Sequence, residues 1–391
     1  MKPDMGLYYE MLDGMAATQP SLSFLARSWP ELETWRATAR AKVSELLAFG
    51  PTDTPLNPSI DSKLEEEGLI VEEISYDMPY GPRTHGFFLH PNKREAALPA
   101  VVALHDHGGF FYFGKEKVTA VRGEPKILRE FKQKYYGGRS WATELAKRGF
   151  AVLAVDNFLW GSRKIPMDTT NEEFREFFTD VEPGSEEYIR RYNQFWETNE
   201  CSVIVDTILN AGTSWPGIFT YEDRRSIDYL VTRPEIDPNR IGCGGLSTGG
   251  LRAIFLAGLD PRVRCGLCIG FMSTIRALLR NHIRCPPGHG LSLYVPHLFR
   301  FLDLPDVIAL RAPAPLMVQY NEEDELFTAG GQHEADRKIA EIYSKMEYRQ
   351  NYVGKFYPGA HKFDVTMQEE AFQWLEKCLL QDSVHSRNSA P

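Results

Sequence analysis

The spacing of hydrophobic positions changes near residue 97 of this chain. Residues 68–90 alternate between apolar and polar side chains around the turn Pro79-Tyr80-Gly81-Pro82, which is typical of a β-hairpin with one face in the core. From residue 97 onward, continuous apolar runs of strand length alternate with helical patterns. Continuous apolar runs indicate strands that are covered on both faces, as in a parallel sheet. The pattern therefore predicts an antiparallel hairpin beside a mostly parallel sheet.

The order of the expected elements defines the fold class. In addition to the hairpin strands 69–78 and 84–89, we expect strands at 100–104, 151–155, 240–244, 263–269, 314–320 and 351–357. Helical patterns lie between them at 141–148, 221–232, 250–257, 334–345 and 367–380. Crossovers between parallel strands are right-handed. The chain is therefore expected to form a doubly wound α/β sheet with helices on both faces, as in the α/β class of ligand-binding folds.

Several regions fall outside this alternation. Residues 1–60 have helical patterns and end in a proline-rich stretch, which predicts a helical appendage on a main domain, 61–380. Two intervals rich in aromatic and charged residues, about 164–219 and 273–310, are expected to insert cap or pocket helices over the carboxyl edge of the sheet, where α/β proteins bind ligands. Residues 381–391 are expected to form a disordered tail.

Composition and charge narrow the class of partner. The formal net charge is −9, whereas a nucleic-acid partner would require a basic face, so a small-molecule substrate is expected and no nucleic acid. No stretch reaches the roughly eighteen consecutive apolar residues of a membrane span. The first residues lack the basic start and apolar run of a secretory signal. We therefore expect no membrane association and a cytoplasmic location, and the sequence leaves a homo-oligomer open.

The six cysteines show no spacing typical of a disulfide framework. Cys265 and Cys268 form a Cys-x-x-Cys pair, but both lie in the expected strand 263–269, where alternation places them on opposite faces. Reduced thiols are therefore expected rather than a redox or metal site.

A serine lies in a glycine-rich turn between an expected strand and an expected helix. The segment reads Gly245-Leu246-Ser247-Thr248-Gly249-Gly250. Glycines two residues before and after a serine fit a sharp strand-to-helix turn, where side chains at these positions would clash with the neighbouring backbone. The motif predicts that Ser247 presents its hydroxyl as a nucleophile. On this motif alone, a purely structural serine in a glycine turn stays an alternative.

A serine nucleophile needs a histidine that takes its proton and a carboxylate that orients the histidine. An acidic run that includes Asp324 follows the expected strand 314–320, and His361 follows the expected strand 351–357. Because both positions lie just after parallel strands, their side chains can meet Ser247 at one edge of the sheet. We expect Asp324 as the acid because it lies a few residues past the strand and precedes the apolar pair Leu326-Phe327. The neighbouring acids remain alternatives: Glu322, Glu323 and Glu325.

The oxyanion of a tetrahedral intermediate requires two backbone N–H donors. The amide of Thr248, directly after the nucleophile, is one expected donor. Gly109, in the segment His105-Asp106-His107-Gly108-Gly109-Phe110 after the expected strand 100–104, is the other. Gly108 and Phe110 remain alternative donors. His105 and His107 also fit a His-x-His metal pair, but no further ligand lies at a helical spacing, so no metal is expected.

These segments resemble the α/β-hydrolase superfamily, and within it the dienelactone-hydrolase-like and acetyl-xylan-esterase-like serine esterases. The resemblance covers about residues 70–380, and it rests on 105–110, 156–163, 228–250 and 304–316. It implies hydrolysis of a carboxylic ester through an acyl-enzyme, without a cofactor, with Ser247, Asp324 and His361 as the catalytic residues. Two features differ from close branches. Dienelactone hydrolases have a cysteine where this chain has Ser247, and the Arg-Gly-Gln loop of the cephalosporin C deacetylase group is absent.

Loops at the same expected edge of the sheet carry the substrate-binding candidates, which are Phe110, Trp160, Phe271 and Met272. Most apolar and aromatic residues in such loops pack in the core or the cap, and that alternative stays open here.

Two other functions fit the same motifs. The first is a peptidase or other acyl hydrolase related to prolyl oligopeptidase, but such proteins usually carry a long upstream propeller, which residues 1–60 are too short to form. The second is a noncatalytic binding protein with a hydrolase fold. A complete set of nucleophile, acid, histidine and oxyanion loop favours an esterase over both.

Overall fold

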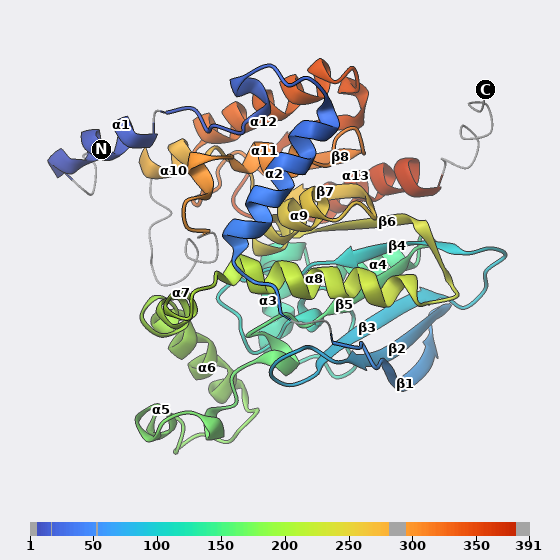
Figure 1. The fold of residues 1–391 in the computed structure, drawn as a ribbon. Helices are drawn as coiled ribbons and strands as arrows, with labels where there is room; N and C mark the ends of the chain where they lie inside the picture. Colours follow the sequence, from blue (N-terminus) through green and yellow to red (C-terminus); the bar gives the residue numbers. More distant parts are fainter. Residues whose placement is uncertain (1–5, 17, 52–53, 281–294, 381–391) are drawn as a thin grey trace.

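A nine-stranded sheet runs through the centre of the molecule, with helices on both faces (Figure 1). The computed structural model describes residues 6–16, 18–51, 54–280 and 295–380. The strand order is β1-β2-β3-β5-β4-β6-β7-β8-β9. The strands are β1 (Ser59–Glu66), β2 (Leu69–Tyr76), β3 (Thr84–Pro91), β4 (Leu98–Ala103), β5 (Ala151–Val155), β6 (Ile236–Leu246), β7 (Val263–Ile269), β8 (Leu316–Asn321) and β9 (Tyr352–Tyr357).

The sheet is antiparallel at one end and parallel elsewhere. The pairs β1–β2, β2–β3 and β3–β5 are antiparallel. From β5 to β9 every neighbouring pair is parallel. All six residues of β8 and all five of β5 are buried, as expected for strands that are covered on both faces. The predicted fold class, a mostly parallel doubly wound α/β sheet, is confirmed.

Two layers of helices cover the sheet. The helices are α1 (Tyr9–Ala16), α2 (Leu32–Leu47), α3 (Lys126–Tyr136), α4 (Trp141–Ala146), α5 (Glu172–Glu176), α6 (Glu186–Asn199), α7 (Asp206–Asn210), α8 (Trp215–Val231), α9 (Thr248–Leu259), α10 (Ile275–Arg280), α11 (Leu304–Ala309), α12 (Ala329–Lys345) and α13 (Val365–Leu375). On one face α3, α4 and α13 pack on alternate residues of the strands, such as Val101 and Val152. On the other face α8 and α9 pack on the intervening residues of the same strands, such as Val102 and Leu153.

The structure contains elements that the hydrophobic pattern does not predict. Strand β1 extends the expected hairpin, and seven of its eight residues are exposed, including Ile60. A strand at the edge that is exposed on both faces has no apolar alternation to reveal it. Helix α3 is also unpredicted, although Leu128, Phe131 and Tyr136 bury one side of it.

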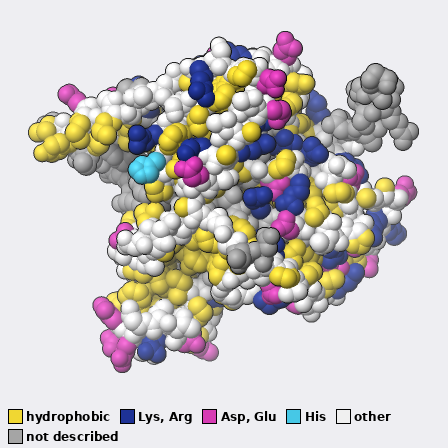
Figure 2. All heavy atoms as spheres, viewed as in Figure 1, with side chains coloured by type: hydrophobic (Ala, Val, Ile, Leu, Met, Phe, Trp, Pro, Cys, Tyr) yellow, Lys and Arg dark blue, Asp and Glu magenta, His cyan; other side chains and the backbone are white. Residues whose placement is uncertain are grey.

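The expected insertion at 164–219 forms an arm that projects from the body, with α5, α6 and α7 along it (Figure 1). A π-helix, η6 (Glu200–Val205), joins α6 to α7. Apolar side chains gather on this arm in the space-filling view (Figure 2), and Phe177, just after α5, is 58% exposed. The π-helix is a type of segment that occurs frequently at functional sites.

The remaining regions fit the expected layout in part. Helix α2 packs against α8 and α9, and its residues Trp35, Ala39 and Val43 are fully buried. The expected insertion at 273–310 contains α10 and α11, while 281–294 lies outside the described residues. The expected tail at 381–391 also lies outside them. The domain boundaries stay predictions. Within the part of the chain that is described, no helix has the length and apolar character needed to cross a membrane.

Candidate active site

Ser247 occupies a strained turn between β6 and α9. Strand β6 ends at Leu246, α9 begins at Thr248, and Ser247 itself has φ 57° and ψ −124°. A non-glycine residue with positive φ is uncommon and costs free energy, and such residues cluster at active sites. The Ser247 N–H donates to the carbonyl of Ile269 at 2.8 Å. The backbone of the turn is therefore fixed against the end of β7.

The glycines around Ser247 allow the backbone of a neighbouring loop to approach the turn. A Cβ atom on Gly245 would lie 2.0 Å from the carbonyl oxygen of Leu104, and one on Gly249 would lie 2.3 Å from the same oxygen. Leu104 directly follows β4, at the start of the segment predicted to supply an oxyanion donor. The glycine pattern is therefore a consequence of packing this segment directly against the serine turn.

Asp324 and His361 form a direct contact. Asp324 lies three residues after β8 and His361 four residues after β9. His361 Nδ1 and Asp324 Oδ2 are 2.7 Å apart. The other oxygen of Asp324 accepts the N–H of Leu326 at 2.9 Å, which fixes the carboxylate. The alternative acids all have exposed side chains, namely Glu322, Glu323 and Glu325. Of the four acids in this run, Asp324 is therefore the one in contact with the histidine.

The ring of His361 lies beside the backbone that holds the serine turn. A Cβ atom on Gly270 would be 3.1 Å from Cε1 of His361, and Gly270 follows Ile269, the residue that binds the Ser247 amide. Nε2 of His361 is buried and has no hydrogen-bond partner among the described residues. A hydrogen bond between this nitrogen and Ser247 is thus not formed here. Catalytic hydrogen bonds are often long in the absence of substrate and tighten when it binds.

The backbone N–H groups expected to bind the oxyanion differ in the hydrogen-bond acceptors that they have in this structure. Thr248 is the first residue of α9, where a backbone N–H has no acceptor within the helix. The N–H of Gly109 donates to Nδ1 of His107 at 3.0 Å. The N–H of Phe110, an alternative donor, donates to the carbonyl of His107 at 3.0 Å. The amides of Gly109 and Phe110 are therefore already engaged by His107, and the oxyanion role of Gly109 stays a prediction.

His107 holds this loop in place as a neutral imidazole. Its Nδ1 accepts the Gly109 N–H, so its proton must be on Nε2, which lies 3.0 Å from Glu200 Oε2. Burial, assisted by the Lys117 ammonium, lowers the pKa of His107 to about 3. The neighbouring His105 binds the backbone through both ring nitrogens. Among the described residues, no group of three or more His, Cys, Asp or Glu is arranged to hold a metal.

Two buried cations tie the loop to the rest of the site. Lys117, which is fully buried, donates to the carbonyls of Asp106 and His107. Arg252 of α9 donates to the carbonyl of His105 at 3.1 Å and forms a two-pronged pair with Asp223 of α8. Neither cation could be predicted from the sequence, because no local motif connects Lys117 or Arg252 to the loop.

The four substrate-binding candidates are all buried, at 1–5% exposure. Phe110 stacks on Phe131 with ring centroids 4.8 Å apart, and Phe271 meets Phe327 edge to face at 5.2 Å. Trp160 stacks between Phe111 and Trp215. Met272 belongs to the same core cluster as Phe271 and Trp160. These contacts are packing contacts, and a role of these residues in substrate binding stays a prediction.

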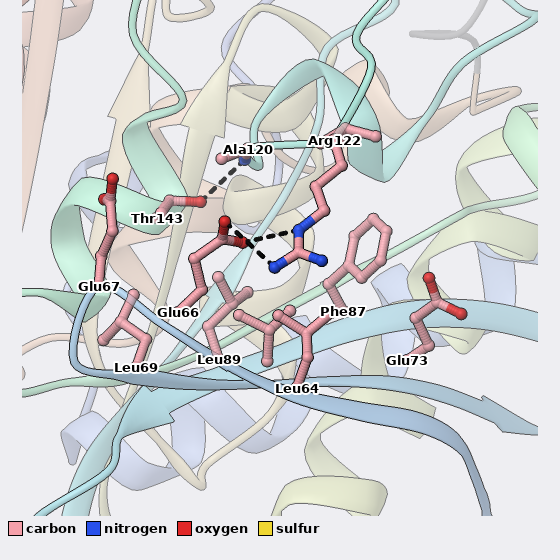
Figure 3. Close-up of a pocket in the computed structure, with 12 residues that line it drawn as sticks. Leu64, Glu66, Glu67, Leu69, Glu73, Phe87, Leu89, Ala120, Arg122 and Thr143 are labelled. Carbon is pink, nitrogen blue, oxygen red and sulfur yellow. Dashed lines mark hydrogen bonds and ion pairs between the residues drawn. The ribbon is translucent and has the colours of Figure 1, made fainter.

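A groove of about 440 Å³ lies elsewhere, on the antiparallel part of the sheet (Figure 3). Leu64, Leu69 and Leu89 line its apolar side, and an ion pair between Glu66 and Arg122 spans it at 3.3 Å. None of the predicted site residues lines this groove. It is therefore separate from the serine turn.

Known proteins match both the sequence and the fold. A model of the Abhydrolase family matches residues 187–352, a range that contains Ser247 and Asp324 and ends before His361. The chain is similar to a putative acetyl xylan esterase from Bacteroides fragilis, with a TM-score of 0.68, 19% identity, and 89% of this chain and 81% of that chain covered. The protein has the α/β-hydrolase fold. This finding confirms the resemblance to the superfamily that the sequence indicated.

Two further known proteins match this chain over nearly their whole length. The putative hydrolase YtaP of Bacillus subtilis (strain 168) is 25% identical over 344 residues, which are 88% of this chain and 100% of that protein. A glucuronoyl esterase from Solibacter usitatus has a TM-score of 0.61 and 15% identity, with 92% of this chain and 97% of that chain covered.

Proposed function

We propose that this α/β-hydrolase is a serine esterase that cleaves small carboxylic esters with Ser247, His361 and Asp324. The observation that carries the proposal is the 2.7 Å contact between His361 and Asp324, on the ring nitrogen opposite the buried Nε2. The strained backbone of Ser247 beside this histidine supports it further. The names of the structural relatives, an acetyl xylan esterase and a glucuronoyl esterase, favour an ester over a peptide as the substrate.

In the proposed reaction, Nε2 of His361 takes the proton of the Ser247 hydroxyl as its oxygen attacks the ester carbonyl carbon. The carbonyl oxygen becomes an oxyanion, and the amide of Thr248 donates to it. The tetrahedral intermediate collapses when the C–O bond to the alcohol breaks and His361 gives its proton to the leaving alcohol. Asp324 stabilises the imidazolium, because its carboxylate accepts a hydrogen bond from the Nδ1–H group throughout, while the proton stays on the ring.

The second half of the reaction releases the acid. His361 deprotonates a water molecule, the water oxygen attacks the acyl-enzyme carbonyl, and the proton returns to the oxygen of Ser247 as the acyl bond breaks. Water and ester are consumed, and an alcohol and a carboxylic acid are formed. This chemistry requires no cofactor and no metal.

Turnover of 4-nitrophenyl acetate tests the proposal. Ser247→Ala is expected to lower kcat by about three orders of magnitude or more, because the nucleophile is removed. Ser344→Ala, which changes an exposed serine of α12, is the matched control and is expected to keep wild-type activity. A fluorophosphonate probe should label the wild type and the control but not Ser247→Ala. Equal turnover by Ser247→Ala and the wild type would refute the proposal.

A further inference from the structure

One face of the arm presents three polar side chains to the loop that follows β4. Asn193, Glu197 and Glu200 are spaced by four and three residues, which places them on one side of a helix. Asn193 Oδ1 accepts the N–H of Tyr112 at 2.9 Å. Glu200 Oε2 lies 3.0 Å from Nε2 of His107. The first and the last residue of this polar face thus bind the loop directly.

Glu197, the middle residue of the face, has no such partner. Its side chain lies over Gly109, because a Cβ atom on that glycine would be 2.8 Å from Oε1 and 3.2 Å from Oε2 of Glu197. The residue is half-buried, and the described residues make no hydrogen bond or ion pair with its carboxylate. Burial and the nearby Glu200 carboxylate raise the pKa of Glu197, and the Lys134 ammonium opposes them only in part.

A half-buried acid that accepts no hydrogen bond from the described residues has a cost in folding free energy, which the attraction of Lys134 offsets only in part. The helix could avoid that cost with a neutral residue at this position, and the loop could fill the space with a side chain at position 109. The chain instead has a glycine with φ 63° in the loop and a carboxylate above it. Acids whose pKa is shifted by burial, at positions that break a local packing rule, occur preferentially at functional sites.

We infer that Glu197 is a specificity-determining residue that accepts a hydrogen bond from a hydroxyl group of the substrate, close to the ester carbonyl. The inference rests on the proposed function, and its geometric basis is that the segment that contains Gly109 begins at Leu104, whose carbonyl packs on the turn of Ser247. A hydroxyl group fits better than a cation, since a cation would have to lose much more hydration to reach a half-buried site. The substrate class is therefore an ester whose alcohol or acid part carries a hydroxyl group.

Matched pairs of esters test this inference. 1-Acetylglycerol and propyl acetate differ by hydroxyl groups on the alcohol side, and ethyl lactate and ethyl propionate differ by one hydroxyl group on the acid side. For at least one pair, the wild type is expected to prefer the hydroxylated ester in kcat/KM. Glu197→Leu is expected to reduce that preference about 10- to 100-fold, because the hydroxyl group loses a charged acceptor. Glu197→Gln retains an acceptor and should reduce it less.

Glu187→Gln is the matched control, because Glu187 lies on α6 and pairs with Arg191 on the exposed surface. It should keep the wild-type preference, and its thermal unfolding midpoint can be compared with that of Glu197→Leu to verify folding. The pair that responds shows whether the hydroxyl group belongs to the alcohol or to the acid.

The outcomes separate the two proposals. If the wild type hydrolyses no ester, the proposed function fails, and the inference fails with it. If the wild type is active and Glu197→Leu retains the preference in both pairs, the inference alone is overturned. Acetylcholine is the cationic probe, and a loss confined to acetylcholine would overturn recognition of a hydroxyl group in favour of a cation.

Discussion

Asp324 and His361 meet at 2.7 Å although 37 positions separate them in the chain. They come from the carboxyl ends of β8 and β9, two neighbouring parallel strands. Parallel strands bring such ends to one edge of the sheet, so the register of the sheet establishes the contact. Residues 322–325 are four consecutive acids, and Asp324 is the one of them that contacts His361.

Asp324→Asn is the first prediction that follows from this contact. An amide can turn its NH₂ group toward Nδ1 and hold the wrong tautomer of the imidazole, and it does not stabilise the imidazolium. We expect kcat for 4-nitrophenyl acetate to fall about 100- to 10,000-fold. Glu323→Gln changes an exposed neighbour and should keep most of the activity. The reverse order of the two losses would assign the acid to Glu323.

Two glycines in helices offer a second prediction. A Cβ atom on Gly249 of α9 would lie 2.3 Å from the Leu104 carbonyl oxygen, whereas one on Gly330 of α12 would meet nothing within 4 Å. Gly330→Ala should raise the free energy of unfolding by about 0.5–1 kcal/mol, because alanine favours the helix. Gly249→Ala should lower it, since the backbone of the loop must move away from the serine turn.

Urea denaturation measures the free energy of unfolding of the two glycine variants. Turnover of 4-nitrophenyl acetate measures their activity. Gly249→Ala should also lose activity, because the loop after β4 and the turn of Ser247 share the contact at Leu104. Equal stability of the two variants would contradict the proposed reason for the glycine at position 249.

The pair between Arg252 and Asp223 leads to a third prediction. Both side chains are almost fully buried, and Arg252 also donates to the carbonyl of His105. Arg252→Met leaves the Asp223 carboxylate buried without its counter-ion, which should lower the free energy of unfolding by about 3–5 kcal/mol. Adding Asp223→Leu should recover part of that loss, because the buried charge is removed as well. A further loss in the double variant would contradict this account.

The sequence predicted the sheet well because its central strands are continuous apolar runs. Strands β5 and β7 have the expected bounds, Ala151–Val155 and Val263–Ile269. The edge strand β1 was not predicted, since its exposed residues, such as Lys63 and Glu65, carry no burial pattern. The periodicity of hydrophobic residues indicates which face of an element is buried. An element without a buried face therefore cannot be predicted from it.

The candidate site was predictable where its residues follow strands, and not where its contacts are long-range. Ser247 and His361 could be chosen from local motifs. Asp324 could be preferred among its acidic neighbours from its place before Leu326-Phe327, and the fold brings it, rather than the exposed neighbours, into contact with His361. The contact of Glu197 with Gly109 joins the arm to a loop 88 positions away, and no spacing rule connects such positions.

Lys117 provides the last prediction, which concerns stability at alkaline pH. The side chain is fully buried, and burial lowers its pKa from 10.5 to about 8. Between about pH 8 and pH 10.5 the unfolded chain therefore retains a proton that the folded chain has released. The unfolded state binds more protons in this range, so this residue makes the free energy of unfolding rise with pH.

Lys117→Met removes this titration. We expect the free energy of unfolding of the wild type, relative to that of the variant, to increase by up to about 3 kcal/mol between pH 8 and pH 10.5. Below pH 8 the difference should be constant, because Lys117 is protonated in both states. Urea denaturation of the two proteins at half-unit steps of pH measures the difference directly. A difference that stays constant up to pH 10.5 would show that folding does not shift the titration of Lys117.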